Sequence, residues 1–140
     1  MNKQSPRHLS RSLAVQVLYH YKLNQASIAE IETYLKEINE ALYAKANSEL
    51  LQFLIETSIA QFDTMLSQYN QYSERNMADI DLTEQIILVI AAVELNHNLS
   101  VPAPVVINEA VELAKRYGAN DSYKFINGLV DKLASSIRST

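Results

Sequence analysis

The sequence contains no cysteine, and this absence excludes several kinds of site. A chain of 140 residues without cysteine can form no disulfide framework, no thiolate metal site and no cysteine nucleophile. The absence also fits a reducing compartment, and no signal peptide is recognisable. We therefore expect a cytoplasmic protein.

Glycine and proline are scarce, with two Gly and three Pro in the whole chain. Few tight turns are available, so long helices are favoured over many short strands. Long apolar runs are also missing: the longest, "IILVIAAV" at 86–93, is far shorter than the roughly 20 residues of a membrane span. We expect one all-α domain, 1–140, large enough to bury a core.

Charge of either sign is unevenly distributed. Residues 1–29 carry Lys3, Arg7, Arg11 and Lys22 without an acid, a charge of +4. Residues 30–114 have three bases and fourteen acids, and residues 115–140 have five bases and two acids, which together give the net charge of -4. Because distant charges are screened beyond about 10 Å, such a molecule can present a local positive field to a polyanion.

Local patterns predict where the helices begin. Ser5 is suited to cap a first helix whose first residue is Pro6, and Ser27 to cap a second, acidic one. Asp81 and Glu84 have the spacing of a capping box for a helix over about 82–96. The apolar stripe expected on the second helix is Ile28, Ile31, Tyr34, Leu35 and Ile38.

The remaining elements are less sharply bounded. Residues 48–72 are either one long helix or two, broken near Thr57 and Ser58, and 73–82 is the best candidate for a junction between two halves. We place an N-terminal sub-bundle at about 1–75 and a C-terminal one at about 76–140. Gly118 is expected to end the next-to-last helix, and Asn120 or Asp121 to cap the last.

Catalytic and metal-binding patterns are missing. Glu94 and His97 have the Glu-x-x-His spacing of di-iron bundles, but such sites need a second copy. No glycine-rich phosphate loop, nucleophile elbow or dinucleotide fingerprint is present. We expect a binding module that is not an enzyme and has no metal or cofactor.

Two stretches carry a family resemblance: "RHLSRSLAVQVLYHYKLNQ" at 7–25 and "VVINEAVELAKRYGANDSYKFINGLVDKLA" at 105–134. Together they resemble the NusB family of bacterial transcription antitermination factors. The second stretch is the specific one, because "INEAVELAK", a glycine and "DSYKFINGLVDKLA" follow the family pattern almost position by position. Residues 26–80 match only in length and helical character.

The resemblance implies an all-helical fold of about seven helices, in two small bundles packed across each other. It also implies a factor that binds boxA single-stranded RNA with NusE, a small-subunit ribosomal protein, and supports ribosomal RNA transcription with other Nus factors in the elongation complex. The RNA-binding residues carried over are Arg7, Arg11, Tyr19, Asp121, Lys124 and Phe125.

The chemistry of these six residues suits single-stranded RNA. Cations follow the RNA backbone and aromatic rings stack on bases, so the Arg and Lys residues supply one kind of contact and Tyr19 and Phe125 the other. Asp121 would either accept from a base edge or cap the last helix. Gly128 shares its helix face with Asp121, Lys124 and Phe125, although glycine inside a helix costs about 1 kcal/mol against alanine.

The chain departs from the family pattern at several positions. His8 and Leu9 stand within the N-terminal arginine cluster, which predicts a lower RNA affinity. Val89 replaces an Arg and Val93 a Tyr in the central helix. Two other functions stay open: the RNA-targeting domain of a ribosomal RNA methyltransferase, and a helical adaptor that binds only protein through its acidic middle.

Overall fold

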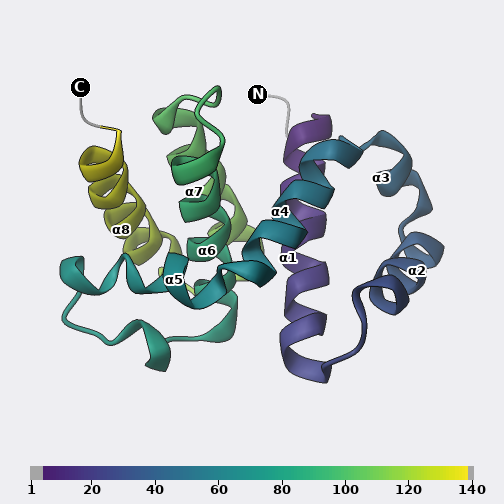
Figure 1. The fold of residues 1–140 in the computed structure, drawn as a ribbon, viewed down its shortest axis with the longest axis horizontal. Helices are drawn as coiled ribbons and strands as arrows, with labels where there is room; N and C mark the ends of the chain where they lie inside the picture. Colours follow the sequence, from purple (N-terminus) through teal and green to yellow (C-terminus); the bar gives the residue numbers. More distant parts are fainter. Residues whose placement is uncertain (1–4, 139–140) are drawn as a thin grey trace. The chain divides into compact units, whose positions relative to one another are not determined.

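The structure, a computed structural model, describes residues 5–138, and these contain helices and no strand (Figure 1). The prediction of an all-α fold is confirmed. The chain divides into two compact units, one that ends at Ile59 and one that begins at Ala60, so the segment 73–82 lies inside the second. The α-helices are α1 (Pro6–Asn24), α2 (Ile28–Ile38), α3 (Glu40–Lys45), α4 (Ser48–Ala60), α5 (Phe62–Ser67), α6 (Leu82–His97), α7 (Ala103–Tyr117) and α8 (Ser122–Ile137), with 3-10 helices η1 (Asn70–Tyr72) and η2 (Met77–Asp79).

Three helix starts follow the local sequence as predicted. The Ser5 hydroxyl accepts from the His8 N–H at 3.2 Å, and Pro6 is the first residue of α1. Ser27 caps α2 in a complete capping box with Glu30. The Asp81 carboxylate accepts from the Thr83 N–H at 3.2 Å at the start of α6. Each cap satisfies an amide that the helix itself leaves without a partner.

Two helix breaks produce more helices than the seven expected. Asn39 leaves the helical conformation, with φ -130° and ψ 38°, and separates α2 from α3. Gln61, with φ -123° and ψ 24°, separates α4 from α5. Residues 48–72 therefore hold two α-helices, but the break lies at Gln61 and not near Thr57 and Ser58. The Gln61 Oε1 accepts from His97 Nε2 at 2.8 Å, which gives the break a tertiary partner.

In the first unit α1 packs against α2 and α3. Ser10 on α1 accepts from the Asn47 N–H at 2.8 Å and lies 2.7 Å from the Asn47 carbonyl oxygen, so the connection before α4 is tied to α1. The stripe predicted for α2 is only partly inward, since Ile31 and Leu35 are buried but Tyr34 and Ile38 are each 57% exposed.

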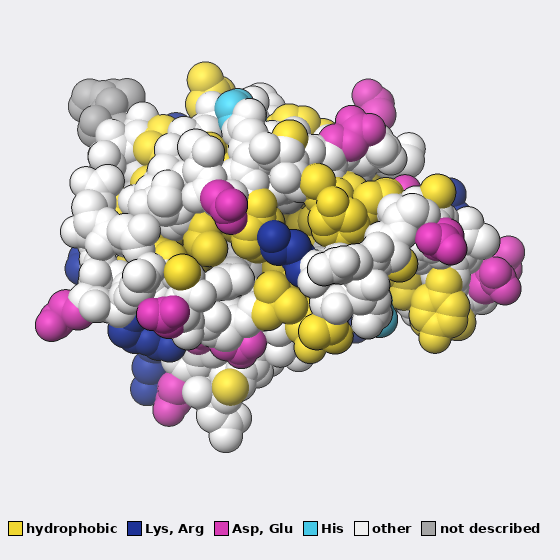
Figure 2. All heavy atoms as spheres, turned by 60° about the horizontal axis from the view of Figure 1, so that its bottom comes forward, with side chains coloured by type: hydrophobic (Ala, Val, Ile, Leu, Met, Phe, Trp, Pro, Cys, Tyr) yellow, Lys and Arg dark blue, Asp and Glu magenta, His cyan; other side chains and the backbone are white. Residues whose placement is uncertain are grey.

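Acidic side chains accompany these exposed apolar ones. Figure 2 shows both kinds next to each other at the right of its view, where α2 and α3 lie. Glu30, Glu37 and Glu40 are exposed there. The prediction that the second helix is acidic outside is therefore confirmed, although part of its apolar stripe is also outside.

The second unit contains a helix that is buried on every side. All side chains from Ile86 to Leu95 on α6 are buried, and α6 packs against α5, α7 and α8. A helix apolar all round is typical of a protein interior. The run "IILVIAAV" is thus a buried helix, as predicted. Among the described residues, no helix is long and apolar enough to cross a membrane.

The far end of this buried helix is closed by Arg138, the residue that follows α8. Its Nε donates to the Leu95 carbonyl at 2.9 Å, and its Nη2 donates to the Glu94 and Asn98 carbonyls at 3.0 and 3.3 Å. Nη1 donates to the Val101 carbonyl at 2.8 Å. The last carbonyls of a helix have no partner within it and carry the negative end of its dipole. One guanidinium therefore joins the end of α8 to the end of α6 and the connection to α7.

We expect Arg138→Ala to lower the free energy of unfolding by about 2–4 kcal/mol, because several charge-assisted hydrogen bonds are lost at once. Arg138→Lys should recover less than half of this, since an ammonium lacks the planar fork. Urea denaturation measures both values. Lys132→Ala, at an exposed position of α8, is the control and should change stability by less than about 0.5 kcal/mol. An Arg138→Ala protein as stable as that control would contradict the assignment.

The two glycines have opposite surroundings. Gly118 ends α7 as predicted, but with φ -86°, outside the left-handed region common at helix ends. A Cβ there would lie 2.7 Å from the Ala114 carbonyl oxygen and 3.0 Å from the Ser122 Cβ. A Cβ at Gly128 would meet no heavy atom of the described residues within 4 Å. The fold thus requires glycine at 118 and does not require it at 128.

Alanine substitutions should therefore act in opposite directions. Gly118→Ala should destabilise the protein by about 1–3 kcal/mol, because a backbone carbonyl cannot move away cheaply. Gly128→Ala should stabilise it by about 0.5–1 kcal/mol through helix propensity alone. Thermal unfolding of both variants, followed by circular dichroism, compares them directly. Destabilisation by Gly128→Ala would show a close contact that the structure lacks.

Candidate nucleic-acid interface

The first helix presents one of its two predicted arginines to solvent. Arg7 is exposed, whereas Arg11 is only 3% exposed and already has a partner within the molecule. Arg7 and Arg11 lie one turn apart on α1, but the turn that holds Arg11 is buried all round. Arg7 is the surface cation of this pair. Lys3 lies outside the described residues.

Tyr19 lies on the same helix as Arg7 but on another part of it. The two residues are twelve positions apart, or about 18 Å along the axis and about 120° around it. Tyr19 is 36% exposed, and its ring meets that of His20 edge to face, with centroids 6.2 Å apart. Arg7 and Tyr19 would therefore have to contact different nucleotides of one strand.

In the second unit, the start of α8 brings Asp121, Lys124 and Phe125 together. Asp121 adopts the left-handed conformation, with φ 66° and ψ 0°, in which Asp is enriched among non-glycine residues. A capping residue is normally extended, and the Asp121 side chain forms no capping hydrogen bond with the described residues. Its carboxylate lies 3.7 Å from Lys124 Nζ instead, and both side chains are largely exposed. The prediction that Asp121 caps α8 through its side chain is wrong.

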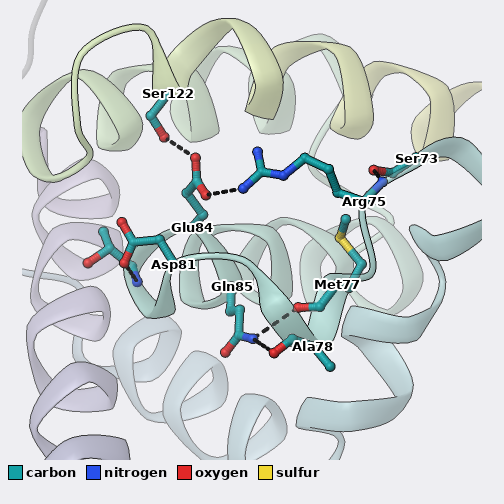
Figure 3. Close-up of polar contacts among 9 residues, drawn as sticks. Ser73, Arg75, Met77, Ala78, Asp81, Glu84, Gln85 and Ser122 are labelled. Atoms are coloured by element: carbon teal, nitrogen blue, oxygen red, sulfur yellow. Dashed lines mark hydrogen bonds and ion pairs between the residues drawn. The ribbon is translucent and has the colours of Figure 1, made fainter.

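Phe125 is half-buried, and a residue that the sequence did not single out covers its ring. The Arg75 guanidinium lies 4.6 Å from the ring centroid, a cation–π contact. The same guanidinium lies 3.9 Å from a carboxylate oxygen of Glu84, and Ser122 Oγ donates to the other oxygen at 2.8 Å. Figure 3 shows that Arg75, from the segment between η1 and η2, and Ser122, from α8, both point to Glu84.

The segment that carries Arg75 is fixed by side-chain hydrogen bonds. Met77 is fully buried, its N–H donates to Asn70 Oδ1 at 3.0 Å, and its carbonyl accepts from Gln85 Nε2 at 2.9 Å (Figure 3). Ser73 Oγ accepts from the Arg75 N–H at 3.0 Å. Arg75 is therefore presented by an ordered turn on the side of α6.

Glu84 does not complete a capping box with Asp81, because it points to Ser122 and Arg75. The box pattern is local, and tertiary partners outcompete it here. Sequence reasoning missed Arg75, Glu84 and Ser122 as members of the site. One signal was available, since Arg75 is the only base between residues 46 and 114.

Glu94 and His97, the Glu-x-x-His pair, have other partners. Glu94 is buried and its carboxylate accepts from Asn98 Nδ2 at 3.4 Å, while His97 Nε2 lies 2.8 Å from Gln61 Oε1. In the part of the chain that the structure describes, no group of three His, Asp or Glu is arranged to hold a metal ion. His97 is a helix-end residue that fixes the break before α5.

Comparison with known proteins adds to this geometry. The model of the NusB family matches residues 8–135, which cover most of both units and all but one of the predicted RNA-binding residues. The chain belongs to the NusB family. It is 40% identical over 136 residues to the transcription antitermination protein NusB of Burkholderia lata, and 39% to that of Burkholderia vietnamiensis. Each alignment covers 97% of this chain and 92% of the relative.

The fold agrees with that of a solved NusB. NusB of T. maritima superposes with a TM-score of 0.72 at 25% identity, and the match covers 94% of this chain and 92% of that one. Two positions of α6, Val89 and Val93, depart from the family pattern. Val89 and Val93 are both fully buried, so these positions belong to the core of this chain.

The Arg75–Glu84 pair is tested with a double-mutant cycle of Arg75→Ala and Glu84→Gln, since Gln can still accept from Ser122. We expect a coupling energy of about 0.5–1 kcal/mol, because Arg75 is half-exposed and solvent screens the pair. Urea denaturation gives the four free energies of unfolding. The control cycle pairs Glu84→Gln with Lys124→Ala and should be additive. A coupling energy of zero in the first cycle would show that the Arg75–Glu84 pair does not contribute to stability.

Proposed function

We propose that this NusB-family protein binds boxA-type single-stranded RNA together with NusE in the cytoplasm, and so supports antitermination on ribosomal RNA operons as part of the elongation complex. It acts in this proposal as an RNA-binding adaptor and not as an enzyme. The RNA contacts proposed are Arg7, Tyr19, Asp121, Lys124 and Phe125, with Arg75 added.

One observation carries the proposal: cations and an aromatic ring meet at the exposed start of α8. Lys124 supplies an exposed positive charge, and the half-exposed Arg75 places its guanidinium over the Phe125 ring, 4.6 Å from the centroid. Single-stranded RNA is bound by backbone cations together with bases stacked on aromatic or guanidinium planes, each stack contributing about 1–3 kcal/mol. The Arg75–Phe125 pair supplies both a charge and a planar surface.

Asp121 has a defined role in this proposal. A carboxylate repels phosphate, but the pairing with Lys124 offsets the negative charge of Asp121. Because its side chain does not cap α8, the carboxylate can accept from the edge of a base. Arg11 has a different role: its burial makes it a residue that shapes the start of α1, while Arg7 reaches the RNA.

Two other functions are less well supported. The relatives that the chain matches over 92% of their length bear the antitermination name, which favours that function over a methyltransferase domain. An adaptor that binds only protein would use the acidic surface of α2 and α3, but it leaves the cations at the start of α8 without a role.

Fluorescence anisotropy with a boxA-containing and a scrambled RNA, each with and without NusE, tests the proposal. We expect tight binding only to boxA RNA with NusE present. Arg7→Ala and Lys124→Ala should each reduce the slope of log affinity against log salt by about 0.7, the contribution of one phosphate on a single strand. Arg11→Ala should leave this slope unchanged and lower the thermal stability instead.

The control for nonspecific charge effects is Lys45→Ala, at an exposed position of α3, which should change neither slope nor affinity. Equal weak binding to both RNAs in the presence of NusE would overturn the proposal. NusE binding of the same strength with and without RNA, and with no boxA preference, would favour the adaptor that binds only protein.

A further inference from the structure

An open groove of about 490 Å³ lies between α7 and α8 of the second unit. Ile107 and Val111 of α7 form an apolar wall, and Lys115 stands at its end. From α8 the groove receives Tyr123, Lys124 and Asn127. Sites for small ligands have volumes of about 300–1,000 Å³, so the groove has room for a base and its sugar.

The charge of the groove favours an anion with an aromatic part. None of the residues that the structure describes as lining it is acidic, and two are lysines. Lys115 Nζ lies 5.1 Å from the centroid of the Tyr123 ring, so a cation and an aromatic ring are already adjacent. Asn127 is exposed on the same wall and offers both a donor and an acceptor.

The groove is continuous with the start of α8. Lys124 lines the groove and also pairs with Asp121 at 3.7 Å, so one side chain belongs to both surfaces. Gly128, one turn further along α8, is exposed and has no neighbour of the described chain that requires a glycine. The position of α8 that follows Asn127 therefore carries no side chain.

We propose that the α7–α8 groove is a second RNA subsite, which holds a nucleotide flanking the boxA-type segment; this rests on the proposed function. The base of that nucleotide lies against Tyr123 and the wall of Ile107 and Val111. Asn127 contacts the base edge, and Lys115 and Lys124 bind the phosphates on either side. The subsite therefore adds affinity for a longer RNA, and Lys124 is the residue that it shares with the proposed boxA contacts.

The experiment compares three RNAs in the presence of NusE: a boxA core, the core extended by four nucleotides on the 5′ side, and the core extended on the 3′ side. We expect one extension to raise the affinity by roughly tenfold, as one stacked base and one phosphate contact would. Tyr123→Ala and Lys115→Ala should each remove most of this gain and leave binding of the core unchanged. Lys115→Ala should also lower the salt slope by about 0.7, for the extended RNA only.

Several outcomes separate this inference from the function on which it rests. If the core RNA does not bind, the proposed function fails. If the core binds but neither extension adds affinity, or the gain survives in Lys115→Ala and Tyr123→Ala, the subsite alone is overturned. Reduced NusE binding by these variants without RNA would identify a protein site instead. Tyr123 is half-buried, whereas Lys115 is exposed. If Tyr123→Ala unfolds the protein, the affinity of Lys115→Met for the extended RNA decides the outcome.

Discussion

The second unit depends on the requirement that α6 be covered on every side while its polar groups keep partners. Most of its backbone groups are hydrogen-bonded within the helix, so the groups that need other partners lie at its ends. Asp81 satisfies the first turn, and Arg138 donates to carbonyls of the last turn from the end of α8. Along the helix, Tyr69 donates to the Leu88 carbonyl at 2.7 Å, and its complete burial raises the pKa of the phenol. The neighbours of α6 are placed by these few contacts as well as by apolar packing.

The candidate site depends on the same need for polar partners, at the opposite end of α6. Glu84 is in the first turns of a buried helix, and a carboxylate there needs compensating donors. Ser122 supplies one from the start of α8, and Arg75 lies close enough to balance the charge. These contacts fix where α8 begins relative to α6, and the left-handed Asp121 is the residue at which the chain turns into it. The surface that carries Lys124 and Phe125 is therefore oriented by buried chemistry beneath it.

The predictable parts of this protein are those that depend on neighbours in sequence. Ser5 with Pro6 predicted the start of α1, and Ser27 predicted that of α2, although its capping-box partner Glu30 was not singled out. No glycine or proline near Asn39 or Gln61 predicts the helix breaks there. The burial of Arg11, and of only part of the α2 stripe, depends on which helix face another element covers. Arg75 meets Phe125 across fifty positions of sequence, a distance over which periodicity gives no information.

This contact also changes how the charge pattern is understood. Counted along the chain, the middle segment carries a charge of -11 and contributes nothing positive to a nucleic-acid surface. In the fold, its Arg75 lies on Phe125 and so joins the basic C-terminal segment, whose Lys115 and Lys124 line one groove. Screening limits each charge to about 10 Å, so the local field near the start of α8 depends on these few cations and their nearest acids. Glu84 pairs with Arg75 and Asp121 with Lys124, so these two pairs add no net charge to the surface, and Lys115 supplies the further positive charge of the groove.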